Sequence, residues 1–144
     1  MAVAIDWRLW ALLGISSTSL VGTPLIIDGK KKKEVDPFEQ TLFEDPNRVG
    51  IVSVKPQVSD AEFADIFKGD ETGNRDQVDI SKVQLFFFTI ISALSYVVTL
   101  FNLLRSTDIP TELPILNDGL IALLTISHGA YLTHKTVDHT PTER

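Results

Sequence analysis

Three largely apolar segments, two of them without any charge, alternate with polar ones along the chain. The clearest is VQLFFFTIISALSYVVTLFNLL, residues 83–104, which has no charged side chain in 22 residues. A helix of that length rises roughly 33 Å, enough to cross a hydrocarbon core of about 30 Å. The alternative, a helix buried in a soluble core, is rarely apolar on every side at this length. The segment therefore predicts a membrane-spanning helix.

The first apolar segment, residues 9–27, is also free of charge but is diluted by serines, threonines and Pro24. Trp7 and Trp10 at its start are typical of the aromatic belt at a membrane surface. A cleaved signal peptide is the alternative interpretation. It is less favoured because Arg8 is the only basic residue before the segment and four lysines follow it. We expect an uncleaved N-terminal transmembrane helix within residues 1–27.

The third segment, residues 114–134, has Asn117 and Asp118 near its start and His128 well inside it. A carboxylate in the first turn can cap free N–H groups and meets the positive end of the helix dipole. The sequence thus predicts an all-α membrane protein with three transmembrane helices. A single span (1–27) is followed by a loop (28–82), a helical hairpin (83–134) and a short tail (135–144).

The basic residues predict an orientation. The loop and the tail together hold 11 of the 13 Lys and Arg residues. By the positive-inside rule both lie in the cytosol and the N-terminus lies outside. The run Lys30, Lys31, Lys32 and Lys33 is expected to contact lipid headgroups, where each lysine gains about 1 kcal/mol from anionic lipids.

The motif Ala-Leu-Leu-x-Ile-Ser begins at Ala11 and again at Ala122. Small residues align in the two copies at every fourth position, which forms one stripe along each helix. These are Gly14, Thr18 and Gly22 in the first copy, and Thr125, Gly129 and Thr133 in the second. Such stripes let helices approach closely in lipid. Chance is the alternative, because the repeated residue types are common in any span.

The stretches DISKVQLFFFTIISALSY and LPILNDGLIALLTISHGAYLTHK carry a resemblance. Together they are similar to a helical hairpin in uncharacterised multi-pass membrane proteins of bacteria, cyanobacteria included. The shared features are a Lys-x-Gln start at Lys82 and a partner helix with Leu-Pro, Leu-Leu-x-Ile-Ser and Tyr-Leu before a basic residue. The resemblance implies a bacterial inner membrane, or a thylakoid, and implies no activity.

In that hairpin the repeated motif lies on the returning helix, and the first copy has no preceding partner helix. We therefore hypothesise either a shortened form of a four-helix protein or a wrongly assigned start of the chain. In a shortened form, another subunit should cover the first stripe.

The loop contains its own signals. Residues 48–56 alternate as a short strand does. Residues 59–69 predict a small amphipathic helix with Ser59 and Glu62 as capping box, lying in the membrane interface or against a partner. The acidic stretch 69–79 lacks the register of a calcium-binding EF-hand. It is better explained as a connection in which Asp79 caps the second span.

The composition narrows the classes of reaction and of binding partner that the chain can have. The chain has no cysteine and a net charge of −6, which excludes thiol chemistry and argues against nucleic acid as a partner. It has no phosphate-binding loop, His-x-x-x-His pair or Gly-x-Ser-x-Gly motif. We expect no enzyme activity, no cofactor and no metal, with His134 and His139 at the surface.

His128 is the one ionisable side chain deep in a predicted span, and such residues are functional candidates. Ser92 and Ser95, across the hairpin, are its expected partners, together with Ser127 on the same helix. The alternative is a neutral histidine that hydrogen-bonds two helices together.

These features favour a structural or anchoring subunit of a larger membrane assembly. Its partners would be the lipid bilayer and other membrane subunits, or further copies of the chain. The second hypothesis is a channel or transport component, formed by oligomerisation around Ser92, Ser95 and His128. It is less favoured because the spans offer no central acid and no broken helix beyond Pro24.

Overall fold

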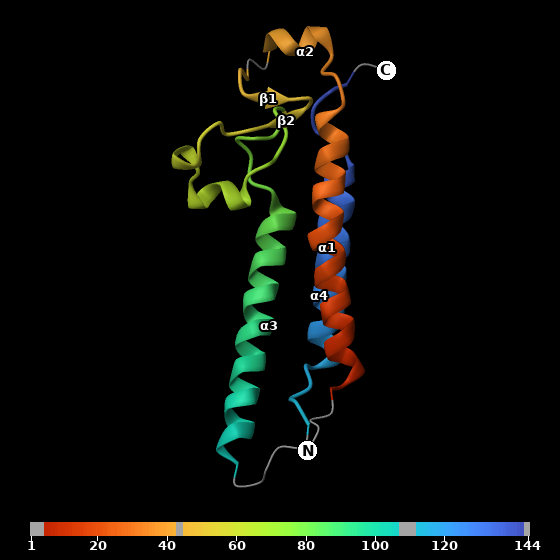
Figure 1. The fold of residues 1–144 in the computed structure, drawn as a ribbon, viewed down its shortest axis with the longest axis vertical. Helices are drawn as coiled ribbons and strands as arrows, with labels where there is room; N and C mark the ends of the chain where they lie inside the picture. The colour runs from red at the N-terminus through yellow and green to blue at the C-terminus, as the bar shows by residue number, and fades with distance from the viewer. Residues whose placement is uncertain (1–4, 43–44, 107–111, 143–144) are drawn as a thin grey trace.

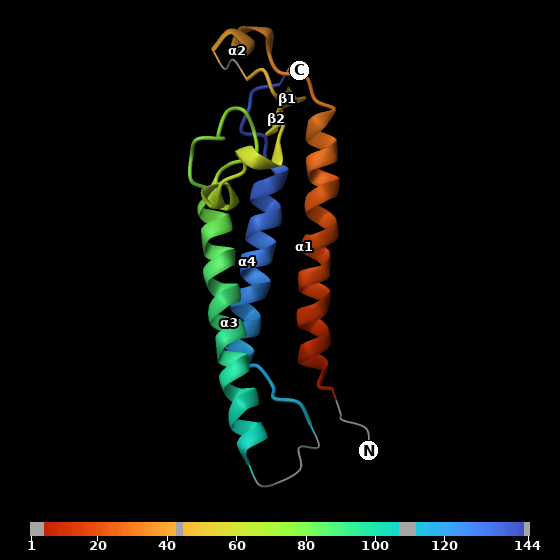
Figure 2. The same ribbon diagram turned by 60° about the vertical axis from the view of Figure 1, so that its left-hand side comes forward.

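Three long helices run the length of the molecule and meet a polar head at one end (Figure 1). The computed structural model describes residues 5–42, 45–106 and 112–142. The helices are α1 (Trp7–Lys31), α3 (Ile80–Arg105) and α4 (Asp118–Thr136). α4 packs against both α1 and α3. α1 and α4 run toward the head and α3 runs away from it, as Figure 2 also shows, so the two copies of the repeat are parallel.

Short polar side chains begin each long helix. The carboxylate of Asp79 accepts hydrogen bonds from the Ser81 and Lys82 amides, so the predicted cap of the second span is confirmed. At α4 the cap is Asn117, and Asp118 is the first helical residue. The carboxylate of Asp118 instead accepts a 2.6 Å hydrogen bond from Nε of Arg8, which joins the starts of α1 and α4.

Two of these helices, α1 and α3, are long and apolar enough to cross a membrane. Among the described residues α4 is not, so the three predicted spans are not confirmed. The reason lies in its composition: charged or polar residues lie at both of its ends, and Ser127 and His128 interrupt the apolar run between them. Both are turned toward neighbouring helices, and Ser127 is buried.

The head begins where α1 ends at Lys31, four residues beyond the predicted boundary at residue 27. It contains the short helix α2 (Pro37–Leu42) and an antiparallel hairpin of β1 (Arg48–Val49) and β2 (Val52–Ser53). The single strand expected at 48–56 is therefore wrong. The chain reverses at Gly50, whose φ of 61° suits glycine. Ile51, in the turn, is fully buried.

The predicted amphipathic helix at 59–69 is also wrong. The segment forms two 3₁₀ helices, Val58–Asp60 and Phe63–Phe67, because the backbone at Ala61 is extended between them. The capping box is present, but it joins Glu62 and Asp65 instead of Ser59 and Glu62. Phe67 makes an edge-to-face contact with Phe86 of α3, at 5.2 Å between ring centres, which fixes this segment to the helix.

Residues 137–142, which belong to the predicted cytosolic tail (135–144), form part of the head. Thr140 is almost fully buried, and Val35 pairs with Thr142 in an antiparallel bridge. The amide of Asp36 donates to the Pro141 carbonyl at 3.2 Å. The C-terminal segment therefore closes over the loop that follows α1.

Candidate functional site

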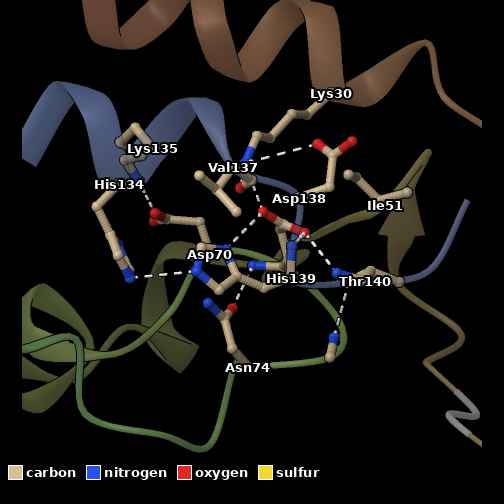
Figure 3. A network of polar contacts seen from close by, with 12 residues as sticks. Lys30, Ile51, Asp70, Asn74, His134, Lys135, Val137, Asp138, His139 and Thr140 are labelled. Atoms are coloured by element: carbon tan, nitrogen blue, oxygen red, sulfur yellow. Dashed lines mark hydrogen bonds and ion pairs between the residues drawn. The ribbon is translucent and has the colours of Figure 1, made fainter.

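A buried network of polar contacts lies where the head meets the ends of the long helices (Figure 3). Three helix ends contribute to it: the C-terminus of α1, the N-terminus of α3 and the C-terminus of α4. Basic side chains at helix C-termini and an acidic one at an N-terminus complement the helix dipoles. We call this network, made of Lys30, Asp70, Glu71, Asp79, Lys82, His134, Lys135, His139 and Thr140, the polar junction.

The centre of the polar junction is an ion pair between Lys30 and Glu71. Nζ of Lys30 lies 2.5 Å from Oε1 of Glu71, and the two residues are only 3% and 2% exposed. Lys30 also donates to the carbonyl of Val137 at 2.6 Å. Burying two charges costs several kcal/mol each, and good geometry with further hydrogen bonds is needed to offset that cost.

Glu71 receives those further hydrogen bonds from the C-terminal segment. Its Oε2 accepts from the amides of His139 and Thr140 at 2.7 and 2.8 Å. The Thr140 hydroxyl in turn accepts from the amide of Gly73 at 3.0 Å. One carboxylate thus joins α1, the acidic loop and the C-terminal segment.

Asp70 forms the second charged contact of the polar junction. One carboxylate oxygen pairs with Lys135 at the end of α4. The other pairs with Lys82 in the first turn of α3, at 2.8 Å. Lys82 also donates to the carbonyl of Lys68 at 2.5 Å. The stretch 69–79, predicted as a simple connection, therefore supplies the acids that hold the basic ends of all three helices.

His134 and His139 form a contacting pair at the edge of the polar junction. Their Nε2 atoms are 3.1 Å apart, and their side chains are 41% and 25% exposed. Nδ1 of His134 lies 3.6 Å from Asp79, and Nδ1 of His139 lies 3.3 Å from Glu71. Within the described residues, no set of three or more His, Asp or Glu side chains is assembled as metal ligands.

The lysine run is not one uniform surface. Lys30 faces the interior, so its predicted contact with lipid headgroups is wrong. The helix continues to Lys31, and Lys30 falls on the packing side of α1, one turn after Ile26. Lys31, Lys32 and Lys33 are exposed, and the last two pair with Asp28 and Asp138 respectively.

Within the helices, His128 bonds to a partner that the sequence did not indicate. Its Nδ1 lies 2.6 Å from the hydroxyl of Ser19 on α1. Ser127, the predicted neighbour, donates instead to the Leu123 carbonyl of its own helix. Ser95 is exposed, whereas Ser92 is 5% exposed and its hydroxyl has no hydrogen-bond partner.

A cavity of about 340 Å³ lies beside this group, between the three helices. Its lining is mostly apolar, with Ser92 and His128 among the few polar groups. The main lining residues are Leu12, Ile15, Ser92, Tyr96, Leu124 and His128. The structure thus brings Ser92 and His128 to one cavity and leaves Ser95 out of it.

The two small-residue stripes are placed differently. Gly22 packs inside the molecule, because a Cβ built there would lie 3.3 Å from the Leu132 side chain. Gly14 and Gly129 have nothing within 4 Å of that position. Thr18 is exposed, as are Thr125 and Thr133 on α4. Most of both stripes is therefore directed away from the contacts within this chain.

One periodic signal could have identified the buried lysine from the sequence. Ser19, Ile26 and Lys30 are spaced by seven and four residues, which is one face of a helix. The partners of Lys30 had no such signal, because Glu71 and the C-terminal segment are distant in sequence. No protein-family model, curated protein or solved structure matches the chain.

Proposed function

We propose that this chain is a structural or anchoring subunit of a larger membrane assembly, with three spans, its N-terminus outside and the head in the cytosol. The observation that carries the proposal is the polar junction. The buried Lys30–Glu71 pair and the Asp70 contacts fasten the head to the ends of all three helices. A head held in this way keeps a fixed position relative to the membrane.

α4 is the least apolar of the proposed spans, and its hydrogen bonds support its place among them. The hydroxyl of Thr125 donates to the Ile121 carbonyl at 2.8 Å, and that of Ser127 to the Leu123 carbonyl at 2.8 Å. Nδ1 of His128 is bonded to Ser19. Polar side chains satisfied within a bundle are tolerated in lipid.

The outward surface of α4 supports a partner helix. Thr125, Gly129 and Thr133 form an exposed stripe, and the space around Gly129 is open. In lipid the hydrophobic effect does not drive apolar helices together. Close packing at such small residues holds them together instead. The stripe is the proposed contact with another membrane subunit.

The test is the mass of the protein extracted gently from its native membrane, with the co-purifying chains identified. We expect a defined complex with other proteins, which Gly129→Leu disrupts while Ser95→Leu leaves it intact. Both substitutions place a leucine at a small, exposed helix position. A monomer without partners, or recovery in the soluble fraction, would overturn the proposal.

A channel or transport component is the second candidate. The cavity between the helices favours it, because Ser92 and His128 bring polar groups to a mostly apolar lining that also includes Ser16, Thr89 and Tyr96. A homo-oligomer with no other chain in the same extraction would favour this function over the anchor. His128 would then be the first residue to replace in a transport assay.

A further inference from the structure

Neighbouring carboxylates orient the rings of His134 and His139 at the edge of the polar junction. His134 belongs to the last turn of α4, and His139 to the segment beyond it. Each ring has one nitrogen, Nδ1, directed at a carboxylate: Asp79 for His134 at 3.6 Å and Glu71 for His139 at 3.3 Å. The other nitrogens, both Nε2, face each other at 3.1 Å.

These carboxylates decide where the ring protons lie. An ionised carboxylate only accepts, so Nδ1 of His139, 3.3 Å from Glu71, is best satisfied by carrying its hydrogen. Nδ1 of His134 lies 3.6 Å from Asp79, beyond hydrogen-bond distance, and only the negative charge of that carboxylate favours a hydrogen there. A neutral imidazole with hydrogen on Nδ1 has its lone pair on Nε2. The 3.1 Å contact between the Nε2 atoms is then bridged either by a hydrogen that one ring donates to the other or by a cation shared between two lone pairs.

The shape of the pair favours a shared metal ion over a straight hydrogen bond between the two rings. A straight N–H···N bond, with an angle above about 150°, places two rings end to end. Here the ring centres are only 4.5 Å apart and the planes differ by 46°, so the rings fold toward one side. Two tetrahedral zinc–nitrogen bonds of about 2.0–2.1 Å would set the nitrogens roughly 3.3 Å apart.

We infer that His134 and His139 bind a divalent transition-metal ion such as Zn²⁺ through their two Nε2 atoms, with water completing the coordination. The Glu71 carboxylate behind the His139 ring matches the usual arrangement around metal-binding histidines, in which the second nitrogen donates to a carboxylate. The partial exposure of both rings gives water and the ion access. Imidazole ligands suit zinc, nickel or copper and do not suit magnesium.

Such an ion would join the end of α4 to the C-terminal segment. It would therefore hold the segment that supplies the two amides bound to Glu71. Metal binding at the histidine pair is then coupled to the stability of the polar junction.

The test is calorimetric titration of the full-length protein in detergent with ZnCl₂, and with MgCl₂ as the control ion. We expect saturable binding of one Zn²⁺ and none of Mg²⁺. His134→Gln and His139→Gln should each weaken zinc binding at least about tenfold, whereas His128→Gln, the remaining histidine of the chain, should not change it. No zinc binding, or binding that survives both substitutions, would overturn the inference.

A second measurement on the unaltered chain covers the case in which a variant does not fold. Paramagnetic Ni²⁺ should selectively broaden the imidazole resonances of His134 and His139 in the NMR spectrum. Broadening of other resonances alone, or a proton shared by the two rings that Ni²⁺ leaves unaffected, would refute metal binding at the pair.

Discussion

Breaking the buried Lys30–Glu71 pair is the sharpest perturbation that the structure offers. Glu71→Gln removes the close counter-charge of the buried Lys30 ammonium and leaves it only the Asp138 carboxylate, 3.9 Å away. It also turns an NH₂ group toward either that ammonium or the amides of His139 and Thr140. Removing one partner of a buried pair typically lowers the free energy of unfolding by about 3–5 kcal/mol, and we expect a loss of stability in that range.

Lys30→Met should destabilise the protein less than Glu71→Gln does. In that variant Glu71 keeps its two amide hydrogen bonds and its contact with the His139 ring. The main losses are one charge-assisted bond, worth about 1.5–3 kcal/mol, and the donor to the Val137 carbonyl. The double variant Lys30→Met/Glu71→Gln removes both charges. It should be more stable than the sum of the single losses predicts, by about 0.5–3 kcal/mol.

The assay is denaturant unfolding in a mild detergent, followed by circular dichroism, with hydrogen exchange at the His139 and Thr140 amides as a local readout. Lys32→Met is the matched control, because it removes a lysine of the same run that pairs with Asp28 at the surface. An exposed pair of this kind contributes about 0–1 kcal/mol. Equal losses for Lys30→Met and Lys32→Met, or strictly additive single losses, would refute the buried pair.

Three further predictions concern other parts of the molecule. Gly50→Ala should destabilise the head by at least about 1–2 kcal/mol in thermal unfolding, since φ is positive and a Cβ would lie 2.4 Å from the Lys31 carbonyl oxygen. The hydrogen bond from Lys55 lowers the pKa of the Asp65 carboxyl. The stability that Asp65 adds should be complete above its ordinary pKa of about 3.9 and disappear as the pH falls below it. An Asp65 carboxyl-carbon NMR titration with an unshifted midpoint would contradict this. Ser19→Ala should lower the free energy of unfolding by about 0.6–1.7 kcal/mol in the same detergent assay, because it removes the hydrogen bond between Ser19 on α1 and His128 on α4.

The sequence predicted the elements that local chemistry controls. Long uncharged runs predicted the helices, because apolar surface without charge needs either lipid or a core. The cap at Asp79 followed from a short acidic side chain before an apolar run. The parallel direction of the two repeat copies followed from the number of helices between them.

The loop between α1 and α3 shows where sequence patterns alone do not predict the structure. The alternation at 48–56 could not distinguish one strand from two, since the decisive feature is the contact of Gly50 with the end of α1. The capping signal at 59–69 was real, but the extended backbone at Ala61 moved it by three residues. Packing of Phe67 on Phe86 then fixes the segment.

The sequence by itself determined the three helices, their order and the polar character of the head. Only the tertiary structure decided which charged residues are buried. Lys30 is one of four consecutive lysines, and its spacing from Ser19 and Ile26 is the only local signal that separates it from Lys31. It differs because the helix turns it toward Glu71, 41 residues away, and toward the C-terminal segment. A charge leaves water only where distant groups converge to replace its hydration, and that convergence is a property of the fold.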